Sequence, residues 1–121
     1  MRIEEKQILK KINLPYTSLI EMEEKWEKTV MSIEQYGYND FLTEYDNDLW
    51  IRNEIEEVLD EKGMQELEHF FAFRENILAI DKRLKSCFIV GAERKDAKFW
   101  WQKGVLKNGS DDYSDDVKHA I

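Results

Sequence analysis

The chain has 121 residues, of which 42% are hydrophobic and 36% charged, and its formal net charge is −8. This length and apolar content fit a single domain with one core and exclude a chain that is disordered throughout. One cysteine excludes an internal disulfide, and no run of residues is long and apolar enough for a membrane span. The N-terminus lacks the pattern of a signal peptide, so we expect a cytoplasmic protein with no membrane partner.

The charged residues are sorted along the chain. Residues 21–68 carry 16 acidic against 4 basic residues, whereas residues 74–107 carry 9 basic against 4 acidic residues. Such a distribution bears on partners and solubility rather than on fold. With one proline and five glycines, the chain has few residues that favour loops, and its composition predicts helices.

Two helices are predicted before Gly37. Residues 2–12 place isoleucines among charged residues at helical spacing, and this helix must end before Pro15. Ser18 and Glu21 form the capping-box pattern that opens a second helix, which Gly37 can terminate. The second helix carries one apolar stripe, formed by Leu19, Met22, Trp26, Val30 and Ile33.

Residues 38–45 are predicted to form a connection or a short helix. The run from Asp46 to Asp48 then offers N-cap residues for a third helix, which we expect to continue through Lys62 and to stop at Gly63. The apolar stripe of this third helix consists of Ile51, Ile55, Val58 and Leu59.

The most regular periodicity spans residues 64–88 and predicts a long central helix. Its seam follows steps of three and four residues through Phe70, Phe73, Ile77, Ile80, Leu84 and Cys87. Leu67, Phe71 and Leu78 widen the seam, so this helix should contact several others. Because one helix cannot bury such a surface alone, we predict an all-α fold: a single-domain bundle of four or more helices over residues 1–121.

An irregular, aromatic segment is predicted after Gly91. Phe99, Trp100 and Trp101 are too apolar to remain solvated, so residues 95–101 should cover the bundle as a short helix or an extended segment. Residues 110–121 are expected to form a ragged tail.

No pattern in the chain requires catalysis or a metal. Glu66 and His69, like Asp116 and His119, have the i, i+3 spacing of helical-bundle metal sites, but no other predicted helix places a glutamate on its apolar stripe. Cys87 lies on the predicted seam, and the common nucleotide, zinc and hydrolase motifs are absent. We therefore predict a non-enzymatic protein with no catalytic residue, no metal ligand and no cofactor.

Residues 94–107 combine Arg94 and four lysines with three aromatic side chains, a mixture that can bind nucleic acid. The net charge of −8 repels phosphate, so we predict no nucleic acid partner. These cations are instead expected to neutralise acidic charge inside the protein, while the aromatic side chains cover the core.

The acidic surface has two interpretations that the sequence leaves open. It can be a solvated helix face, because glutamate is a strong helix former. It can also be a docking face that speeds encounter with a basic protein partner. The acids predicted to form that face lie at the start and on the outer side of the third helix: Asp46, Asp48, Glu56, Glu57, Asp60 and Glu61.

The chain resembles the small acidic immunity proteins that neutralise bacterial toxins, including those of contact-dependent growth inhibition and other polymorphic toxin systems. The resemblance rests on size, acidity, a helical body and the segments 81–84 and 99–101. It implies a tight one-to-one complex with a cationic toxin domain, often a nuclease, which is blocked by occlusion without turnover. It transfers no site residue to this chain.

Three alternatives remain at this point. One is a phage or mobile-element inhibitor that mimics DNA and targets a host nucleic-acid enzyme. Another is a metal-binding helical-bundle enzyme, which the absence of positioned catalytic groups disfavours. The last is a homodimer formed through surplus apolar surface at Phe41, Trp50 or the pair Trp100 and Trp101.

Overall fold

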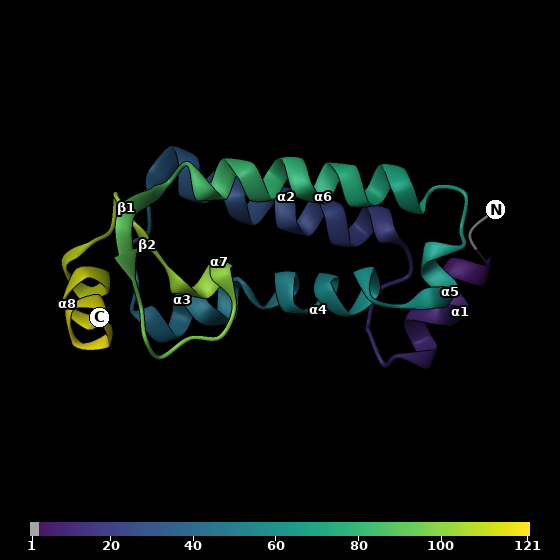
Figure 1. Ribbon diagram of the computed structural model, residues 1–121, viewed down its shortest axis with the longest axis horizontal. Coiled ribbons are helices and arrows are strands. Elements are labelled where there is room, and N and C mark those ends of the chain that lie inside the picture. The colour runs from purple at the N-terminus through teal and green to yellow at the C-terminus, as the bar shows by residue number, and fades with distance from the viewer. Residues whose placement is uncertain (1–2) are drawn as a thin grey trace.

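The computed structural model describes residues 3–121 and is mostly helical, with one small two-stranded sheet (Figure 1). The expectation of an all-α protein is therefore correct only approximately. The elements in chain order are α1 (Ile3–Lys11), α2 (Leu19–Tyr36), α3 (Leu42–Asp48), α4 (Trp50–Leu59), α5 (Lys62–Gln65), α6 (Phe70–Lys85), β1 (Phe88–Glu93), α7 (Trp100–Lys103), β2 (Gly104–Leu106) and α8 (Asp111–Ala120).

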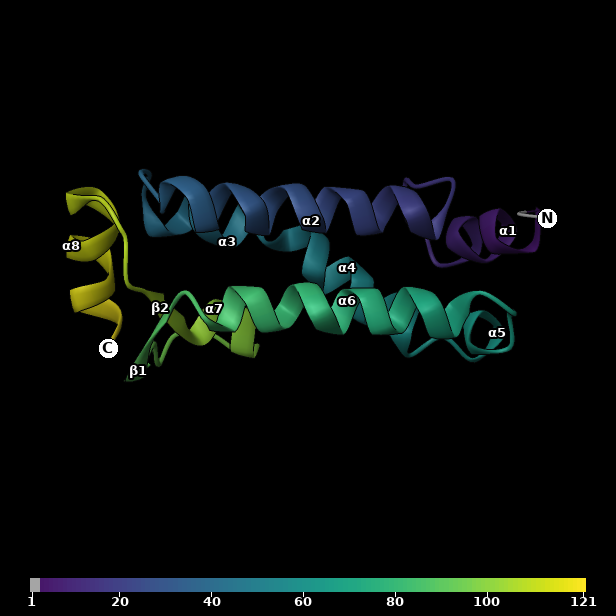
Figure 2. The same cartoon turned by 90° about the horizontal axis from the view of Figure 1, so that it is seen from above.

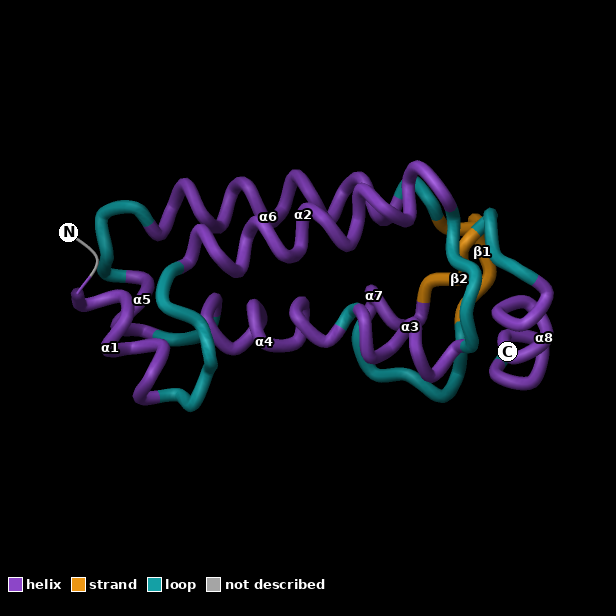
Figure 3. The backbone as a smooth tube through the Cα atoms, turned by 180° about the vertical axis from the view of Figure 1, so that it is seen from behind, coloured by secondary structure: helices purple, strands orange, loops and turns teal. Residues whose placement is uncertain are grey.

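The helices form two layers (Figures 1 and 3). α2 and α6 lie side by side and run in the same direction, as the view from above shows (Figure 2). α3, α4 and α7 form the second layer, and the core lies between the two. α1 and α5 close one end of the molecule, while the sheet and α8 close the other.

The predicted start, stripe and end of α2 are confirmed. Its five stripe residues are all buried, and the Ser18 hydroxyl accepts a hydrogen bond from the Glu21 amide at 3.2 Å. The Glu21 carboxylate accepts from the amide of Thr17, at 2.9 Å, rather than from that of Ser18. Gly37 ends the helix with a φ of 71°, and any side chain there would collide with the Asn108 backbone. Glycine is thus required on two counts.

The predicted third helix is divided in two. Asp46 and Asp48 lie in the last turn of α3 and do not cap α4, which begins at Trp50. Leu42 and Tyr45 share one face of α3 and are buried in the core, and Leu49 separates α3 from α4. α4 also ends earlier than expected, at Leu59, and Gly63 lies inside α5.

The predicted central helix over residues 64–88 is interrupted. α5 ends at Gln65, α6 begins at Phe70 and ends at Lys85, and Cys87 is a half-buried residue beyond it. Phe71 and Leu78 do not widen the buried seam, because they are 68% and 42% exposed. After Lys85 the chain leaves the helix and enters β1, which pairs antiparallel with β2.

The C-terminal segment is regular rather than ragged. Phe88 pairs with Leu106 and Glu93 with Gly104, while the register shifts between these pairs. The Ser110 hydroxyl accepts from the Tyr113 amide at the start of α8. Tyr113 and Val117 are buried, so the last residues close one end of the core. The prediction of a ragged tail is wrong, because the Ser110 cap and the buried pair Tyr113 and Val117 stabilise α8.

Candidate functional site

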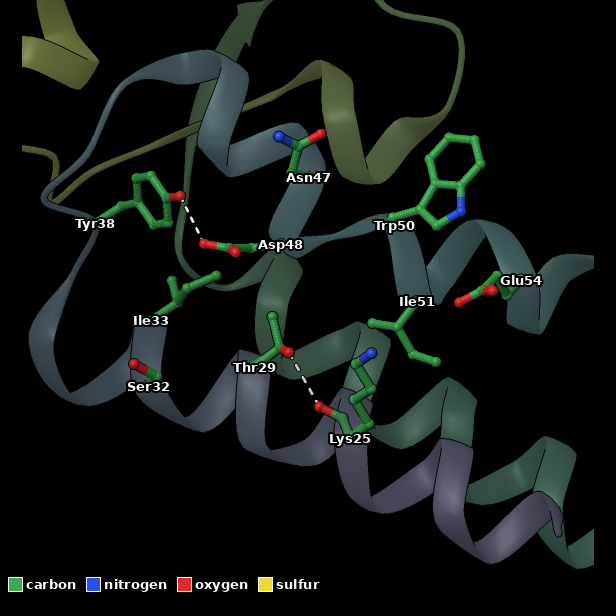
Figure 4. Close-up of a pocket in the computed structure, with 10 residues that line it drawn as sticks. All are labelled: Lys25, Thr29, Ser32, Ile33, Tyr38, Asn47, Asp48, Trp50, Ile51 and Glu54. Atoms are coloured by element: carbon green, nitrogen blue, oxygen red, sulfur yellow. Dashed lines mark hydrogen bonds between the residues drawn. The ribbon is translucent and has the colours of Figure 1, made fainter. Parts of the chain in front are cut away.

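Two adjoining hollows lie beside α4. The smaller one, of about 380 Å³, lies between α2 and the junction of α3 with α4, with Tyr38 and Asp48 at one end and Trp50 and Glu54 at the other (Figure 4). The larger one has a volume of about 730 Å³, and we call it the acidic groove. Its lining residues are Ile12, Asn13, Leu14, Trp50, Asn53, Glu54, Glu56, Glu57, Asp60, Lys98 and Phe99. Trp50 and Glu54 line both hollows.

The periodicity of α4 explains how its side chains form this groove. Ile51, Ile55 and Val58 point into the core. The positions that follow Trp50 on the outer side, at steps of four and then three residues, are Glu54, Glu57 and Asp60, so one helix face presents an indole and three carboxylates. The segment from Ile12 to Leu14 and the pair Lys98 and Phe99 supply the other walls.

The structure brings three of the six predicted partner-binding residues together in the acidic groove. These are Glu56, Glu57 and Asp60. Glu57 and Asp60 are exposed, and within residues 3–121 neither side-chain carboxylate accepts a hydrogen bond. Glu56 accepts from the Arg52 guanidinium at 2.8 Å, so one of its oxygens is already occupied.

The other three predicted residues lie outside the groove. Asp46 accepts hydrogen bonds from Arg94 at 2.7 and 3.0 Å. Asp48 lines the smaller hollow and accepts from the Tyr38 hydroxyl at 2.7 Å. Glu61 accepts from the Gly63 amide at 3.2 Å and thereby caps α5. Each of these three carboxylates therefore has a structural contact.

Sequence reasoning missed Glu54, which lies at the centre of the site. Its Oε1 accepts from the Tyr16 hydroxyl at 2.7 Å, and the Lys25 ammonium donates to the Tyr16 oxygen at 3.4 Å. Burial and the bond to Glu54 raise the pKa of the Tyr16 phenol well above its usual value, so Tyr16 remains a neutral donor. This contact holds Glu54 between the two hollows. The four-residue step from Trp50 could have indicated it.

A buried polar cluster fixes the orientation of α4. The Arg52 guanidinium donates twice to Asp81 at 3.0 Å, and the Trp26 indole donates to the same carboxylate at 3.0 Å. The guanidinium carbon also lies 4.5 Å from the ring centre of Trp101. The cluster joins α2, α4, α6 and α7, and so it determines where the outer face of α4 points.

Arg94 serves an internal role, as the sequence predicts for the basic segment. Its side chain is only 3% exposed and contacts Asp46, Asp96 and the Gln102 carbonyl. Burial alone would lower the pKa of Arg94, but the hydrogen bonds to Asp46 and Asp96 raise it above its usual value. This guanidinium is therefore not presented to phosphate.

No group of three or more histidine, cysteine or acidic side chains within residues 3–121 is arranged to hold a metal. His69 contacts Glu5, with its Nε2 2.9 Å from Oε1, and His119 contacts the Asp115 carbonyl at 2.8 Å. Burial raises the pKa of the Cys87 thiol, which disfavours the nucleophilic thiolate.

The acidic groove combines four carboxylates and one ammonium group with exposed aromatic surface, a combination that attracts cations. No helix in the described range is long and apolar enough to cross a membrane. Comparison of the chain with protein-family models, curated proteins and solved structures found no match.

Proposed function

We propose that this chain is a non-enzymatic binding protein that neutralises a basic protein partner by occlusion. The observation that carries the proposal is the acidic groove, where Glu54, Glu56, Glu57 and Asp60 face a single cation, Lys98. A basic segment seated there would gain from opposite charge and from aromatic contact. The chain's net charge of −8 would also speed the encounter.

The protein class that fits this role is an immunity protein of a bacterial toxin system. A toxin nuclease must present cations to hold nucleic acid phosphates, and a carboxylate-lined surface is complementary to such a cleft. The inhibitor would act in the cytoplasm of the cell that it protects and would need no cofactor. Occlusion requires a stable complex rather than turnover, and the buried hydrogen bonds between Arg52 and Asp81 anchor α4 to α6 beneath the groove.

The proposal is tested by capture from a lysate of the source organism, followed by reconstitution with the purified captured protein. The expected result is a one-to-one complex with a basic toxin-like domain, whose activity falls to background when one equivalent of this chain is added. A full complex that leaves the toxin active would contradict neutralisation.

Two other results would redirect the assignment. Capture and inhibition of a host polymerase or nuclease would replace the immunity role with DNA mimicry. Sedimentation of the isolated chain measures whether it forms a homodimer. Such a dimer would bury Trp50 or Phe41, which are 57% and 52% exposed in the single chain. A dimer that excludes the basic partner would contradict the proposal.

A further inference from the structure

The strand β1 presents apolar side chains to solvent at the end of the molecule that the sheet closes (Figure 1). Val90 is 96% exposed, more than any other large hydrophobic side chain of the described residues, and its neighbour Ile89 is 43% exposed. Many exposed strand edges carry lysine or proline, which discourages pairing with another chain, but β1 contains neither. Exposed apolar surface of this kind is typical of an interaction site.

A bulge in β1 accounts for the exposure of Val90. The two residue pairs that join β1 to β2 lie at the ends of β1, so residues 89–92 face only Val105. Because these surplus residues cannot all pair with β2, the chain bends outward there. Gly91 has a φ of 83° and open space on the side where a Cβ would lie, so nothing in this part of the fold covers the bend. The bulge therefore presents Val90 to solvent.

A hollow of about 300 Å³ adjoins this bulge. Phe88, Ile89 and Trp100 give it apolar surface, while Lys85 and Glu93 line it with one charge of each sign. The Lys85 ammonium lies 4.5 Å from the ring centre of Trp100. Within residues 3–121 neither Lys85 nor Glu93 forms an ion pair, so both charges can pair with another molecule. We call β1 and this hollow the strand face.

We propose that two copies of the chain form a symmetric dimer through the strand face. A two-fold axis sets the two β1 strands antiparallel, so that Val90 of each copy packs on Ile89 and the hollow of the other. The start of one strand then lies beside the end of the other. Lys85, which precedes β1, thereby approaches Glu93 of the second copy, and the same contact occurs twice.

The charges of the hollow identify a second copy as the occupant. A basic partner would meet Lys85 with like charge, and an acidic partner would meet Glu93 with like charge. The two-fold arrangement instead gives each of these charges a partner of opposite sign. Two chains with a net charge of −8 repel each other, but salt at about 0.15 M screens this repulsion beyond about 8 Å.

This dimer goes beyond the proposed function and does not depend on it. The hollow beside β1 and the acidic groove have no lining residue in common, so the dimer leaves both grooves open. A dimer through Trp50 would instead cover the groove, because Trp50 lines it.

The test is sedimentation equilibrium of the full chain in about 0.15 M NaCl, at concentrations from about 10 µM to about 1 mM. Because the contact is small, we expect a weak dimer with a dissociation constant of roughly 10–300 µM. Val90→Asp should weaken the dimer about tenfold or more, since it places a charge in the apolar contact. A wild-type chain that stays monomeric throughout this range would overturn the inference.

The matched control is Phe71→Asp, which changes the net charge equally. Phe71 is also exposed, but it lies on α6 and does not line the hollow. This variant should weaken the dimer less than about twofold. Circular dichroism checks that both variants keep the helical content of the wild type. If Val90→Asp weakens the dimer no more than Phe71→Asp does, the strand face is not the interface.

Mixing two charge variants tests the two-fold contact itself. Lys85→Glu alone and Glu93→Lys alone should each weaken self-association about threefold or more, because each places like charges across the axis. An equimolar mixture of the two variants should form a heterodimer with an affinity within about twofold of the wild type, because both contacts then join opposite charges. A mixture that associates no better than the separate variants would refute the antiparallel arrangement.

Discussion

Replacing Asp81 with alanine should destabilise the protein strongly, because this carboxylate is the main partner of a buried guanidinium. Both Asp81 and Arg52 are buried, and two hydrogen bonds of 3.0 Å join them. A third hydrogen bond, from the Trp26 indole, would also be lost. Glu56 and the ring of Trp101 would remain as partners of Arg52.

Breaking a buried ion pair from one side destabilises a protein by about 3–5 kcal/mol, and small domains have about 5–15 kcal/mol in total. The exposed pairs of Arg83 with Glu27 and Glu34 also join α6 to α2, and their side chains are 32–40% exposed. Arg83→Ala should therefore lower the free energy of unfolding by about 1 kcal/mol or less.

The assay is urea denaturation followed by circular dichroism at the helix minimum. With an m-value near 1.5 kcal/mol/M, Asp81→Ala should lower the urea midpoint by about 2 to 3 M, and Arg83→Ala by less than about 1 M. If Asp81→Ala does not fold, Arg52→Met combined with Asp81→Leu should recover stability, since a hydrophobic pair removes the orphaned charge. An Asp81→Ala protein as stable as Arg83→Ala would refute the role assigned to this cluster.

Three further outcomes are expected. Gly37→Ala should destabilise the protein by at least about 1 kcal/mol in the same urea assay, because φ is 71° and the new side chain would meet the Asn108 backbone. The hydrogen bond from Arg94 lowers the pKa of Asp96 in the folded protein. The contact therefore stabilises the fold fully above the unfolded pKa of about 4, and this stabilisation is lost as the pH falls through the lower, folded pKa. Between pH 7 and pH 2 the urea midpoint should fall less steeply for Asp96→Asn than for the wild type. Val117→Ala should loosen α8 and make residues after Ser110 the first site of limited proteolysis, whereas the wild-type chain should resist cleavage there.

Local patterns in the sequence predict the long helices well. The stripe of α2 repeats at helical spacing for about four turns, and its Ser18 cap and Gly37 terminus are both visible in the sequence. The interruption before α6 is harder to predict, because the apolar steps of three and four residues continue across the turn between α5 and α6. Phe71 and Leu78 continue the apolar pattern, yet they lie on the exposed side of α6.

The order of α8 depends on partners that are distant in sequence. Tyr113 meets the rings of Tyr38 and Tyr45, with centroid distances of 5.9 and 5.7 Å. The tail has only two buried hydrophobic residues of its own, so periodicity gives a weak signal there. Ser110 followed by Asp111 and Asp112 is the pattern in the sequence that indicates the start of this helix.

The candidate site was predictable only in part. The outer acids of α4 follow from helical spacing, so the sequence predicts Glu57 and Asp60. The remaining walls come from segments near Ile12 and Phe99, which meet α4 only in the folded chain. Sequence spacing also could not show that Asp46 is paired with Arg94, 48 residues away.

The most direct test of the central claim is the association rate of the captured basic partner with a charge-reversed groove. Glu57→Lys with Asp60→Lys should slow association and reduce its dependence on salt, while Glu66→Lys with Glu68→Lys, which changes the net charge equally, should have a much smaller effect. Equal rates and equal salt dependence for both variants and the wild type would show that the face of α4 is a solvated surface and not the docking site.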